Sequence, residues 1–426
     1  MLSNQEFHWP TIVKSASVTT VGPGSKRHSI LIPLSSCYNA LNYVAKWSLR
    51  MKPSDASSQI LKLINLEKGI SRKALSEETG MSQASLTKIT RALMEQGYLA
   101  EGERIGSGLG RKEVLLYARA DRHRLLGVDI GGYKIRAAVA DNSLTIHARA
   151  EWEMRHFAER NDKAAFLLEH IEDFLANNGI AKDSIDAIGV GVTGVVDAGL
   201  QRILNIPNAE GWNHIELAAS MKQAFACPLF LDEGGRTMAL AEKFEGKGKK
   251  LEHLITVQIG FGIAAGVIVN GSLLRGSNNV AGLLGHITAD NKGIRCTCGN
   301  YGCLENIITY PMIELAYRAK GGQSDSLLEA YQTNDKIALD ACLEAGEACG
   351  IALSNMVNLF NPEAIFVGGP VIEQLPAVFD EMKRTIKLRA NRFATQRLLM
   401  ERSTFGSDEG VAGALTLAKS KLLGWF

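Results

Sequence analysis

The chain has 426 residues, of which 46% are hydrophobic, and its mean hydropathy is −0.01. A chain of this length buries substantial cores, so we expect two or three folded domains. No segment approaches the roughly 18 consecutive apolar residues that a membrane helix needs, so we expect no membrane insertion.

The charge is unevenly divided along the chain. Residues 1–120 carry 16 lysines and arginines against 9 acidic residues, whereas residues 121–426 carry 31 against 36. A basic first part favours contact with a polyanion such as DNA. A solvated basic face without any partner would give the same composition.

Seven cysteines are an odd number, and three of them lie between Cys296 and Cys303. This crowding favours metal binding over a disulfide framework, and it favours a reducing compartment. The short apolar run at residues 30–32 follows basic residues, but Pro33 interrupts it, which argues against a signal peptide. We therefore expect a cytoplasmic protein.

A DNA-binding domain is expected over residues 56–120. Apolar residues repeat at helical spacing from Ile60, a second helix is expected over Ser71–Thr79, and a third follows the turn at Gly80. Two later apolar runs, at residues 98–100 and 114–117, enclose a glycine-rich segment, as the two strands of a wing do. This order predicts a winged helix-turn-helix. The N-terminal extension, residues 1–55, has no assignable fold.

The third helix has one apolar face and one polar face. Leu86, Ile89 and Leu93 share the packing face, and Ser82 is placed to cap the first free amides. Polar residues on the other face can contact base edges and phosphates from the major groove. With one arginine of the wing, the predicted DNA-contacting residues are Ser82, Gln83, Ser85, Thr87, Lys88, Arg91 and Arg111. A small helical interaction module with a solvated basic face is the alternative.

From residue 121, strands and helices alternate, which indicates an α/β domain over residues 121–426. The first strand, over residues 125–130, ends at Gly131-Gly132. The other elements expected are strands over residues 135–140, 188–192, 254–259 and 364–367, and helices over residues 164–176, 237–244, 313–360 and 410–423.

One histidine and three cysteines are expected to form a metal site. His286 precedes Cys296, Cys298 and Cys303, so one imidazole and three thiolates lie in a short segment rich in glycine. Four such ligands suit tetrahedral zinc, and a complete set of four leaves no position for a catalytic water. We expect one structural zinc ion per chain. Three buried thiols beside an unrelated histidine are the alternative.

The motifs together resemble the ROK family of repressors, open reading frames and sugar kinases, in the repressor branch with an N-terminal winged helix. The resemblance covers about residues 60–420. It rests on five segments. Leu126–Lys134 is similar to the first phosphate loop, Gly191–Asp197 has the pattern G-x-x-G-x-V-D, and Pro207–Trp212 has P-N-x-x-G-W. Gly282–His286 has G-x-x-G-H, and Cys296–Glu305 has C-x-C-G-x-x-G-C-x-E. The last is the most specific.

The resemblance implies an actin-like ATPase fold, also called ribonuclease H-like, in which two α/β lobes form a sugar-kinase-like effector domain. It also implies homodimers or homotetramers and a small sugar or sugar-phosphate effector. The zinc-bound histidine would contact the sugar, and a glutamate would accept a sugar hydroxyl. The effector residues implied are His286, Glu305, Asn208, Thr193 and Glu233.

Two departures from the family pattern indicate that kinase activity is lost. The family base lies in an N-D-x-N segment, and counting back from Glu242 puts Gly234 in its position and Glu233 in the position of the asparagine. A shift of one or two residues would restore a carboxylate. Tyr133 replaces a threonine in the first phosphate loop, where a ring hinders close approach of the backbone to a phosphate. We interpret the glycines at residues 260–262 and 368–369 as tight strand-to-helix turns.

A third departure concerns the sugar itself, because Leu283 stands where the family has a glutamate. The site therefore favours a different sugar, a modified one or none. The function expected is a sugar-responsive transcriptional repressor that binds a two-fold symmetric double-stranded operator and is not an enzyme. Two alternatives stay open: an ATP-dependent sugar kinase with an appended DNA-binding head, and a constitutive DNA binder with a degenerate sensor.

Overall fold

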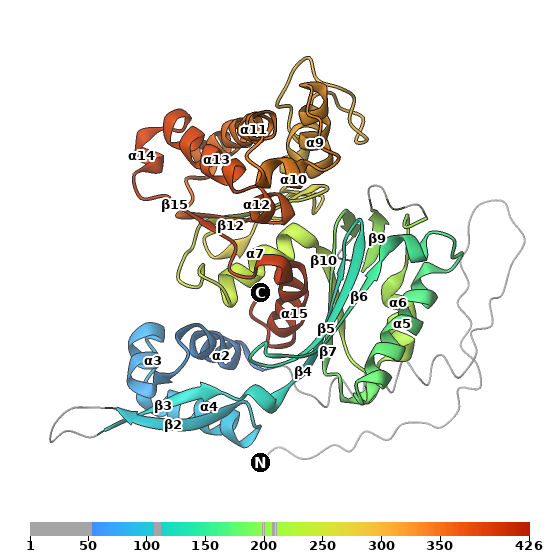
Figure 1. Cartoon of the computed structure of the whole chain (residues 1–426). Coiled ribbons are helices and arrows are strands. Elements are labelled where there is room, and N and C mark those ends of the chain that lie inside the picture. The colour runs from blue at the N-terminus through green and yellow to red at the C-terminus, as the bar shows by residue number, and fades with distance from the viewer. Residues whose placement is uncertain (1–52, 106–111, 198, 200, 207–208, 210) are drawn as a thin grey trace, which may run out of the picture. The chain divides into compact units, whose positions relative to one another are not determined.

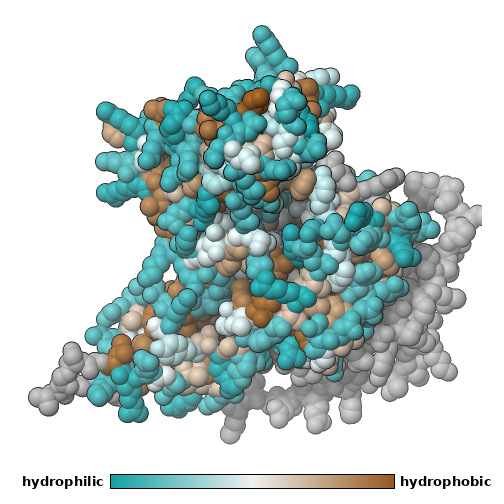
Figure 2. Space-filling model, in the orientation of Figure 1, coloured by the Kyte–Doolittle hydropathy of each residue, from teal (hydrophilic) through white to brown (hydrophobic). Residues whose placement is uncertain are grey.

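The computed structural model describes residues 53–426 except 106–111, 198, 200, 207, 208 and 210 (Figure 1). The N-terminal extension predicted over residues 1–55 falls almost entirely outside this range, as do Arg111 and Asn208. Within the described range, no helix is both long and apolar enough to cross a membrane. The face drawn in Figure 2 has hydrophobic residues scattered among hydrophilic ones.

The first domain begins with three helices that each start at a serine cap. Ser54, Ser71 and Ser82 accept hydrogen bonds from backbone N–H groups of the first turns, which leaves fewer amides without partners. Gly80 ends the second helix in the left-handed conformation that glycine adopts without strain. The helices are α2 (Asp55–Glu67), α3 (Arg72–Thr79) and α4 (Gln83–Glu95).

A three-stranded sheet completes this domain, in the order β1-β3-β2 with antiparallel pairing. Its strands are β1 (Ile70–Ser71), β2 (Leu99–Ile105) and β3 (Glu113–Ala118). Leu75, Leu86, Leu93 and Leu116 are buried in one apolar cluster, so the helices and the sheet share a core. The winged helix-turn-helix predicted from the sequence is confirmed.

The first α/β lobe is built on a five-stranded sheet in the order β10-β7-β4-β5-β6. Neighbours are parallel from β10 to β4 and antiparallel from β4 to β6. The strands are β4 (Arg124–Ile130), β5 (Lys134–Asp141), β6 (Ile146–Glu153), β7 (Ala187–Val192) and β10 (Leu229–Glu233). Figure 1 shows α5 (Lys163–Asn177) and α6 (Leu217–Ala224) on one face and α15 (Glu409–Leu422) on the other. A two-stranded ribbon of β8 (Val195–Asp197) and β9 (Arg202–Asn205) follows β7.

The second lobe has another five-stranded sheet, in the order β13-β12-β11-β14-β15. Its strands are β11 (Leu254–Ile259), β12 (Ile263–Val269), β13 (Ser272–Leu273), β14 (Ala364–Gly368) and β15 (Leu399–Arg402). Its helices are α8 (Glu305–Ile308), α9 (Tyr310–Ala319), α10 (Leu327–Gln332), α11 (Lys336–Phe360), α12 (Pro370–Gln374), α13 (Pro376–Arg389) and α14 (Arg392–Thr395). Apolar residues of α11 and α13 share a core with β11 and β14.

One helix connects the two sheets. α7 (Gly234–Phe244) packs on β11 and β12 of the second lobe and on α15, which covers β4 and β7 of the first. Every residue of α7 is buried, as expected of a helix with neighbours on all sides. These two lobes behind a winged helix-turn-helix confirm the sugar-kinase-like fold predicted from the sequence. Short 3₁₀ turns complete the chain at residues 120–122, 154–157, 182–184, 284–286 and 406–408.

Two details differ from the expectation. The single helical stretch predicted over residues 313–360 is three helices, α9, α10 and α11, because Gly321 and Asn334 adopt positive φ and reverse the chain. The glycines at residues 260–262 join two antiparallel strands, β11 and β12, so this turn is strand-to-strand and the prediction was wrong there. Gly369 does join a strand to a helix, from β14 to α12.

Candidate functional site

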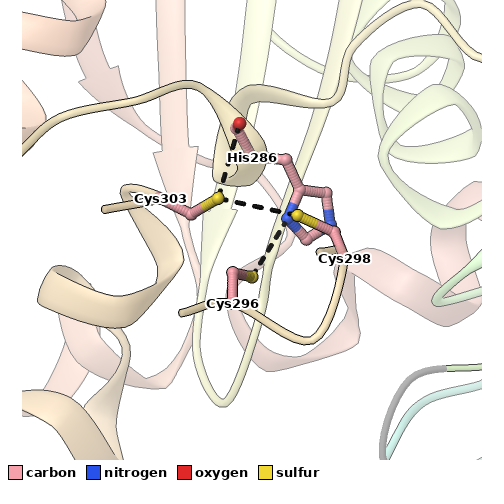
Figure 3. Close-up of side chains that lie close together, drawn as sticks. All are labelled: His286, Cys296, Cys298 and Cys303. Atoms are coloured by element: carbon pink, nitrogen blue, oxygen red, sulfur yellow. Dashed lines mark hydrogen bonds between the residues drawn. The ribbon is translucent and has the colours of Figure 1, made fainter. Parts of the chain in front are cut away.

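Four side chains converge beside the second lobe, and they are the four predicted metal ligands: His286, Cys296, Cys298 and Cys303 (Figure 3). Their ligand atoms all lie within 4.8 Å of one another. Nδ1 of His286 is 3.7 Å from Sγ of Cys296, and Sγ of Cys298 is 3.6 Å from Sγ of Cys303. With Zn–S bonds of about 2.3 Å, ligand atoms of a tetrahedral site lie about 3.8 Å apart. The cluster therefore fits a tetrahedral metal ion.

The backbone folds tightly around this cluster. Gly299 and Gly302 adopt positive φ of 96° and 65°, and a Cβ at Gly302 would lie 1.6 Å from the carbonyl oxygen of Asp290. The N–H group of Cys296 donates to the carbonyl of Asn300. These glycines allow tight turns between the second and third cysteines, which brings the three thiols close together.

Protonation of the thiols depends on burial and on their neighbours. Burial, together with hydrogen bonds to Cys298 and Cys296, raises the pKa of Cys303 to about 12. A backbone hydrogen bond at Asn300 lowers the pKa of Cys298, which is exposed. A bound cation favours the thiolate form of each ligand, so metal binding would release protons from this cluster.

Glu305, predicted to accept a sugar hydroxyl, lies beside the metal cluster. It begins α8, two residues after Cys303, and Oε2 accepts a hydrogen bond of 3.2 Å from the N–H of Ile263. A Cβ at Gly262 or Gly285 would lie only 3.4 or 3.3 Å from the same oxygen. Glycine at both positions therefore leaves room for this carboxylate between the turn before β12 and the loop that carries His286.

Glu233, another predicted effector residue, is the N-cap of α7. Its two carboxylate oxygens accept hydrogen bonds from the N–H groups of Gly235 and Arg236, at 2.9 and 3.1 Å. Burial raises its pKa to about 7, although Arg236 opposes this shift. Thr193, also predicted, directly follows β7, whose last residue pairs in register with Glu233. At Gly234, which was predicted to occupy the position of the kinase base, a Cβ would have no contact shorter than 3.5 Å.

A buried ion network next to Glu233 was not predicted. Oδ1 of Asp232 accepts from Nε of Arg236 at 2.7 Å, and its Oδ2 accepts from Nη2 of Arg275 at 2.6 Å. Arg236 also donates to the carbonyl of Asn279, and Arg275 to its side chain. The network fixes the loop that leads to Leu283 and His286 against the start of α7. Asp232 lies on β10 and Arg236 lies in the first turn of α7, so this pair depends on the strand-to-helix turn and had no signal in the sequence.

Two exposed aromatic rings lie on glycine turns, one in the segment similar to the first phosphate loop and one at residues 260–262. Tyr133 lies between β4 and β5, Phe261 lies between β11 and β12, and the two rings are in contact, tilted by 35° with centroids 3.9 Å apart. They bring together the first and second lobes. Sequence reasoning singled out Tyr133 but not its partner.

A pair of buried carboxylates lies near the end of β4. Asp129 accepts a hydrogen bond of 3.3 Å from Arg136, and burial raises its pKa to about 6. Glu409, at the start of α15, lies beside Ser403 and Gln258, and burial raises its pKa to about 8, although these two neighbours oppose the shift. A Cβ at Gly368 would lie 2.2 Å from Oε2 of Glu409, so this carboxylate packs directly on the turn after β14. Asp129 lies in the motif Leu126–Lys134 but was not predicted as a site residue, and Glu409 lies in no motif.

The predicted DNA-contacting residues of the helix-turn-helix lie on the open face of α4. Leu86 and Leu93 are buried, whereas the polar residues proposed for contact are exposed: Ser82, Gln83, Ser85, Thr87, Lys88 and Arg91. Gln83, Thr87, Lys88 and Arg91 line a surface depression of about 660 Å³. Ser82 has a second role as the N-cap, because its hydroxyl accepts from the N–H of Ser85 at 3.2 Å.

Comparisons with known proteins agree with both parts of the chain. The profile of the ROK family matches residues 125–421, and a profile of winged helix-turn-helix DNA-binding domains matches residues 55–100. The xylose repressor of Bacillus subtilis (strain 168) is 30% identical over 335 residues, covering 78% of this chain and 86% of that protein. The N-acetylglucosamine repressor of Escherichia coli O157:H7 is 28% identical over 381 residues, covering 86% and 93%.

Solved structures lead to the same family. A ROK family transcriptional regulator, a homologue of the E. coli MLC protein, superposes with a TM-score of 0.73 at 26% identity and covers 86% of this chain and 96% of its own. A ROK family glucokinase from Streptomyces griseus, in complex with glucose and AMPPNP, gives 0.61 at 25% identity and covers 70% and 99%. The glucokinase covers a smaller share of this chain than the regulator does. With its family profile matched over residues 125–421, the chain belongs to the ROK family.

Proposed function

We propose that this protein is a sugar-responsive transcriptional repressor of carbohydrate genes. The proposal rests on two features that occur in one chain. The helix α4 has an exposed polar face, and the ROK domain has Gly234 in the predicted position of the kinase base. Family relatives that span most of the chain are repressors. The α4 residues, with Arg111 of the wing, would read the operator.

The effector site combines one metal-bound imidazole with carboxylate and hydroxyl groups. The residues proposed to contact a sugar or sugar phosphate are His286, Glu305, Asn208, Thr193 and Glu233. The named relatives respond to different sugars according to their names, xylose and N-acetylglucosamine, so the family name does not identify the ligand here. Leu283 removes one carboxylate from this set, which changes the hydroxyl pattern that the site accepts.

Zinc is the metal we propose for the cysteine cluster, one ion per chain in a structural role. Three thiolates and one imidazole at tetrahedral spacing support zinc over magnesium or calcium, which prefer oxygen ligands. The ion would fix the loop from His286 to Cys303, and with it the position of Glu305.

Loss of kinase activity is supported by three features of the described residues. Gly234 supplies no carboxylate, Tyr133 lies in the segment similar to the first phosphate loop with the Phe261 ring against it, and Glu409 adds a buried acid against Gly368. Phosphate groups would meet aromatic rings and a carboxyl group there. A kinase with an appended DNA-binding head is the second candidate, because a ROK glucokinase shares the fold of both lobes.

We further propose a cytoplasmic homodimer or homotetramer. Two recognition helices related by a two-fold axis would contact successive major grooves of a symmetric operator. The domain division proposed is residues 1–55, 56–120 and 121–426. Effector binding would shift the population between DNA-binding and non-binding states. The difference between the effector's affinities for these two states sets the size of the shift.

The test is binding to the DNA upstream of the chain's own gene, followed by fluorescence anisotropy at fixed salt with and without a panel of sugars and sugar phosphates. Specific binding released by one sugar is the expected result. Specific binding that no sugar alters would favour a constitutive binder. Sugar-dependent release of ADP at ordinary enzyme rates, with no specific DNA binding, would favour the kinase.

A further inference from the structure

The three thiols of the metal cluster differ in exposure, and this difference carries an inference that rests on the proposed zinc site. Cys298 is exposed, whereas Cys296 and Cys303 are only 4% and 0% exposed. The neighbours of Cys298 in the loop, residues 297 and 299–301, are exposed as well. A Cβ at Gly299 would meet no atom of the described residues within 4 Å, so this side of the loop faces solvent. A small solute therefore has access to one thiol of the cluster.

A buried thiol of the cluster is held against the exposed one. Sγ of Cys303 lies 3.6 Å from Sγ of Cys298, and the two sulfurs face each other (Figure 3). Nδ2 of Asn300 donates to Sγ of Cys303 at 3.5 Å, and an isolated β-bridge to Thr288 fixes the backbone of Cys303. Four residues separate the two cysteines, and two of the four are glycines with positive φ. Such a turn can move by the small distance that a disulfide bond requires.

This arrangement has the two features of cysteines that respond to oxidants. The thiolate is the form of cysteine that reacts, and a cation that binds a cysteine keeps it in this form. Oxidant-responsive cysteines are accessible to solvent and lie next to a second thiol that reacts with the first product. Among the described residues, the cysteines outside the cluster are Cys227, Cys342 and Cys349, and all three are buried. They therefore lack the first feature.

We propose that Cys298 and Cys303 form a peroxide-sensitive pair, and that their oxidation to a disulfide removes two of the four metal ligands. The Cys298 thiolate attacks one oxygen of hydrogen peroxide, which gives a sulfenic acid and a hydroxide ion. The Cys303 thiolate then attacks the sulfur of the sulfenic acid, so that the disulfide bond forms and a second hydroxide ion leaves. Two electrons pass from the pair to the peroxide, and two protons from solvent convert the hydroxide ions to water.

The disulfide would act on the segment that carries two proposed effector residues. Only His286 and Cys296 remain as ligands, and two ligands do not make the closed set of four that holds a structural zinc ion. Glu305 follows Cys303 by two residues, so it lies next to the altered thiol. Peroxide should therefore lower the temperature of thermal unfolding as a chelator does.

Hydrogen peroxide treatment of the full-length, zinc-loaded protein tests the inference. We expect release of about one zinc ion per chain to a chromophoric chelator, with the chelator alone as baseline. Mass spectrometry of the alkylated and digested chain should find a disulfide between Cys298 and Cys303, and dithiothreitol with added zinc should restore the metal content. Cys298→His should keep the metal, because imidazole is also a zinc ligand, and should release it at least about tenfold more slowly under peroxide. Cys342→Ala removes a buried thiol outside the cluster and is the control.

Three results would overturn the inference: no zinc release under peroxide, a disulfide that joins Cys298 to a cysteine other than Cys303, or equally fast release from Cys298→His. The disulfide map of the native chain decides alone when Cys298→His does not retain the metal. Zinc that stays bound while the thiols stay reduced overturns this inference and leaves the proposed metal site intact. A purified chain that binds no zinc overturns the proposed metal site, and the inference with it.

Discussion

Nζ of Lys419 lies 2.6 Å from Oδ1 of Asn65, which joins the last helix of the ROK domain to the first helix of the winged-helix domain. The same ammonium group is 2.8 Å from Oε1 of Glu245, at the end of α7, and Lys419 is only 1% exposed. Nδ2 of Asn65 donates to the carbonyl of Phe244 and to Glu245, both at 3.2 Å. Since Glu233 is the N-cap of α7, one helix extends from the proposed effector site to this contact.

Lys419→Met should destabilise the protein strongly. It leaves the Glu245 carboxylate and the Asn65 amide without their buried cation, and removing one partner of a buried pair costs about 3–5 kcal/mol. Urea unfolding measures the loss. Lys250→Ala is the matched control, because the Lys250–Glu67 pair also joins the two domains but is exposed, and surface pairs contribute about 0–1 kcal/mol. Equal stability of Lys419→Met and the native protein would contradict the structure of this contact.

Removal of the metal should destabilise the second lobe. We expect the native protein to contain about one zinc ion per chain, and Cys303→Ser to lose it. Metal analysis of the purified chain and thermal unfolding with and without a chelator measure both effects. Cys349→Ser is the control, since Cys349 is a buried thiol outside the cluster. Zinc content that is unchanged in Cys303→Ser would show that the four side chains do not form the site.

The exposed face of α4 gives two kinds of DNA variant. Lys88→Ala should weaken binding to specific and unrelated DNA about equally and reduce the salt slope by about 1, as expected of a phosphate contact. Gln83→Ala should instead reduce the difference in affinity between the operator and unrelated DNA, because glutamine forms hydrogen bonds with base edges. Anisotropy titrations at several salt concentrations separate the two effects. Identical behaviour of both variants would argue against a recognition role for α4.

Features that depend on local chain signals were predictable. The serine caps and Gly80 are visible in the sequence because a cap needs only a few neighbouring residues, and the spacing of Cys296, Cys298 and Cys303 is a local pattern in the same sense. The helix break at Asn334 was missed because asparagine tolerates positive φ without a fixed sequence signature.

Contacts between distant segments could not be predicted in this way. Tyr133 and Phe261 are far apart in the sequence, and only the packing of the two lobes brings their rings together. The same is true of Glu409, whose burial depends on Gly368, Ser403 and Gln258 from three separate places in the chain. The network of Asp232, Arg236 and Arg275 was also missed, because it depends on the turn from β10 to α7 and on a third member far along the chain.

Stability should fall as the pH rises from about 4.5 to about 8. Burial raises the pKa of Glu409 to about 8, so the folded state keeps a proton that the unfolded state loses near its ordinary pKa of 4.5. Glu409 thus favours folding fully below that lower value, and the contribution is lost as the pH approaches 8. Asp129 and Glu233, with pKa values raised to about 6 and about 7, act in the same direction.

Glu409→Gln should therefore reduce this pH dependence. Relative to the native protein, its free energy of unfolding should be higher at pH 8 than at pH 5 by at least about 1 kcal/mol, since one pKa unit corresponds to about 1.4 kcal/mol. Urea unfolding at the two pH values measures the difference. Glu373→Gln, which changes an exposed acid near Glu409, should keep the native profile. A native-like profile in Glu409→Gln would mean that this carboxyl group is ionised in the folded protein.

Restoring the carboxylate of the kinase base should not restore kinase activity. A Cβ at position 234 fits, because the nearest atom is 3.5 Å away, and circular dichroism checks that Gly234→Asp folds. An aspartate there would supply the base that accepts a hydroxyl proton. Phosphate positioning would still be missing, because the Tyr133 and Phe261 rings are in contact across the two glycine turns and Glu409 packs on Gly368.

A coupled assay for ADP release, with glucose, xylose and N-acetylglucosamine, measures the kinase activity of Gly234→Asp. We expect no turnover above the level of Gly234→Asn, which has nearly the same size and no base. Sugar-dependent turnover in Gly234→Asp alone would show that the missing carboxylate is the sole defect and that the two aromatic rings leave room for a nucleotide. In that case the loss of phosphate positioning would need to be abandoned as a reason for the lack of kinase activity.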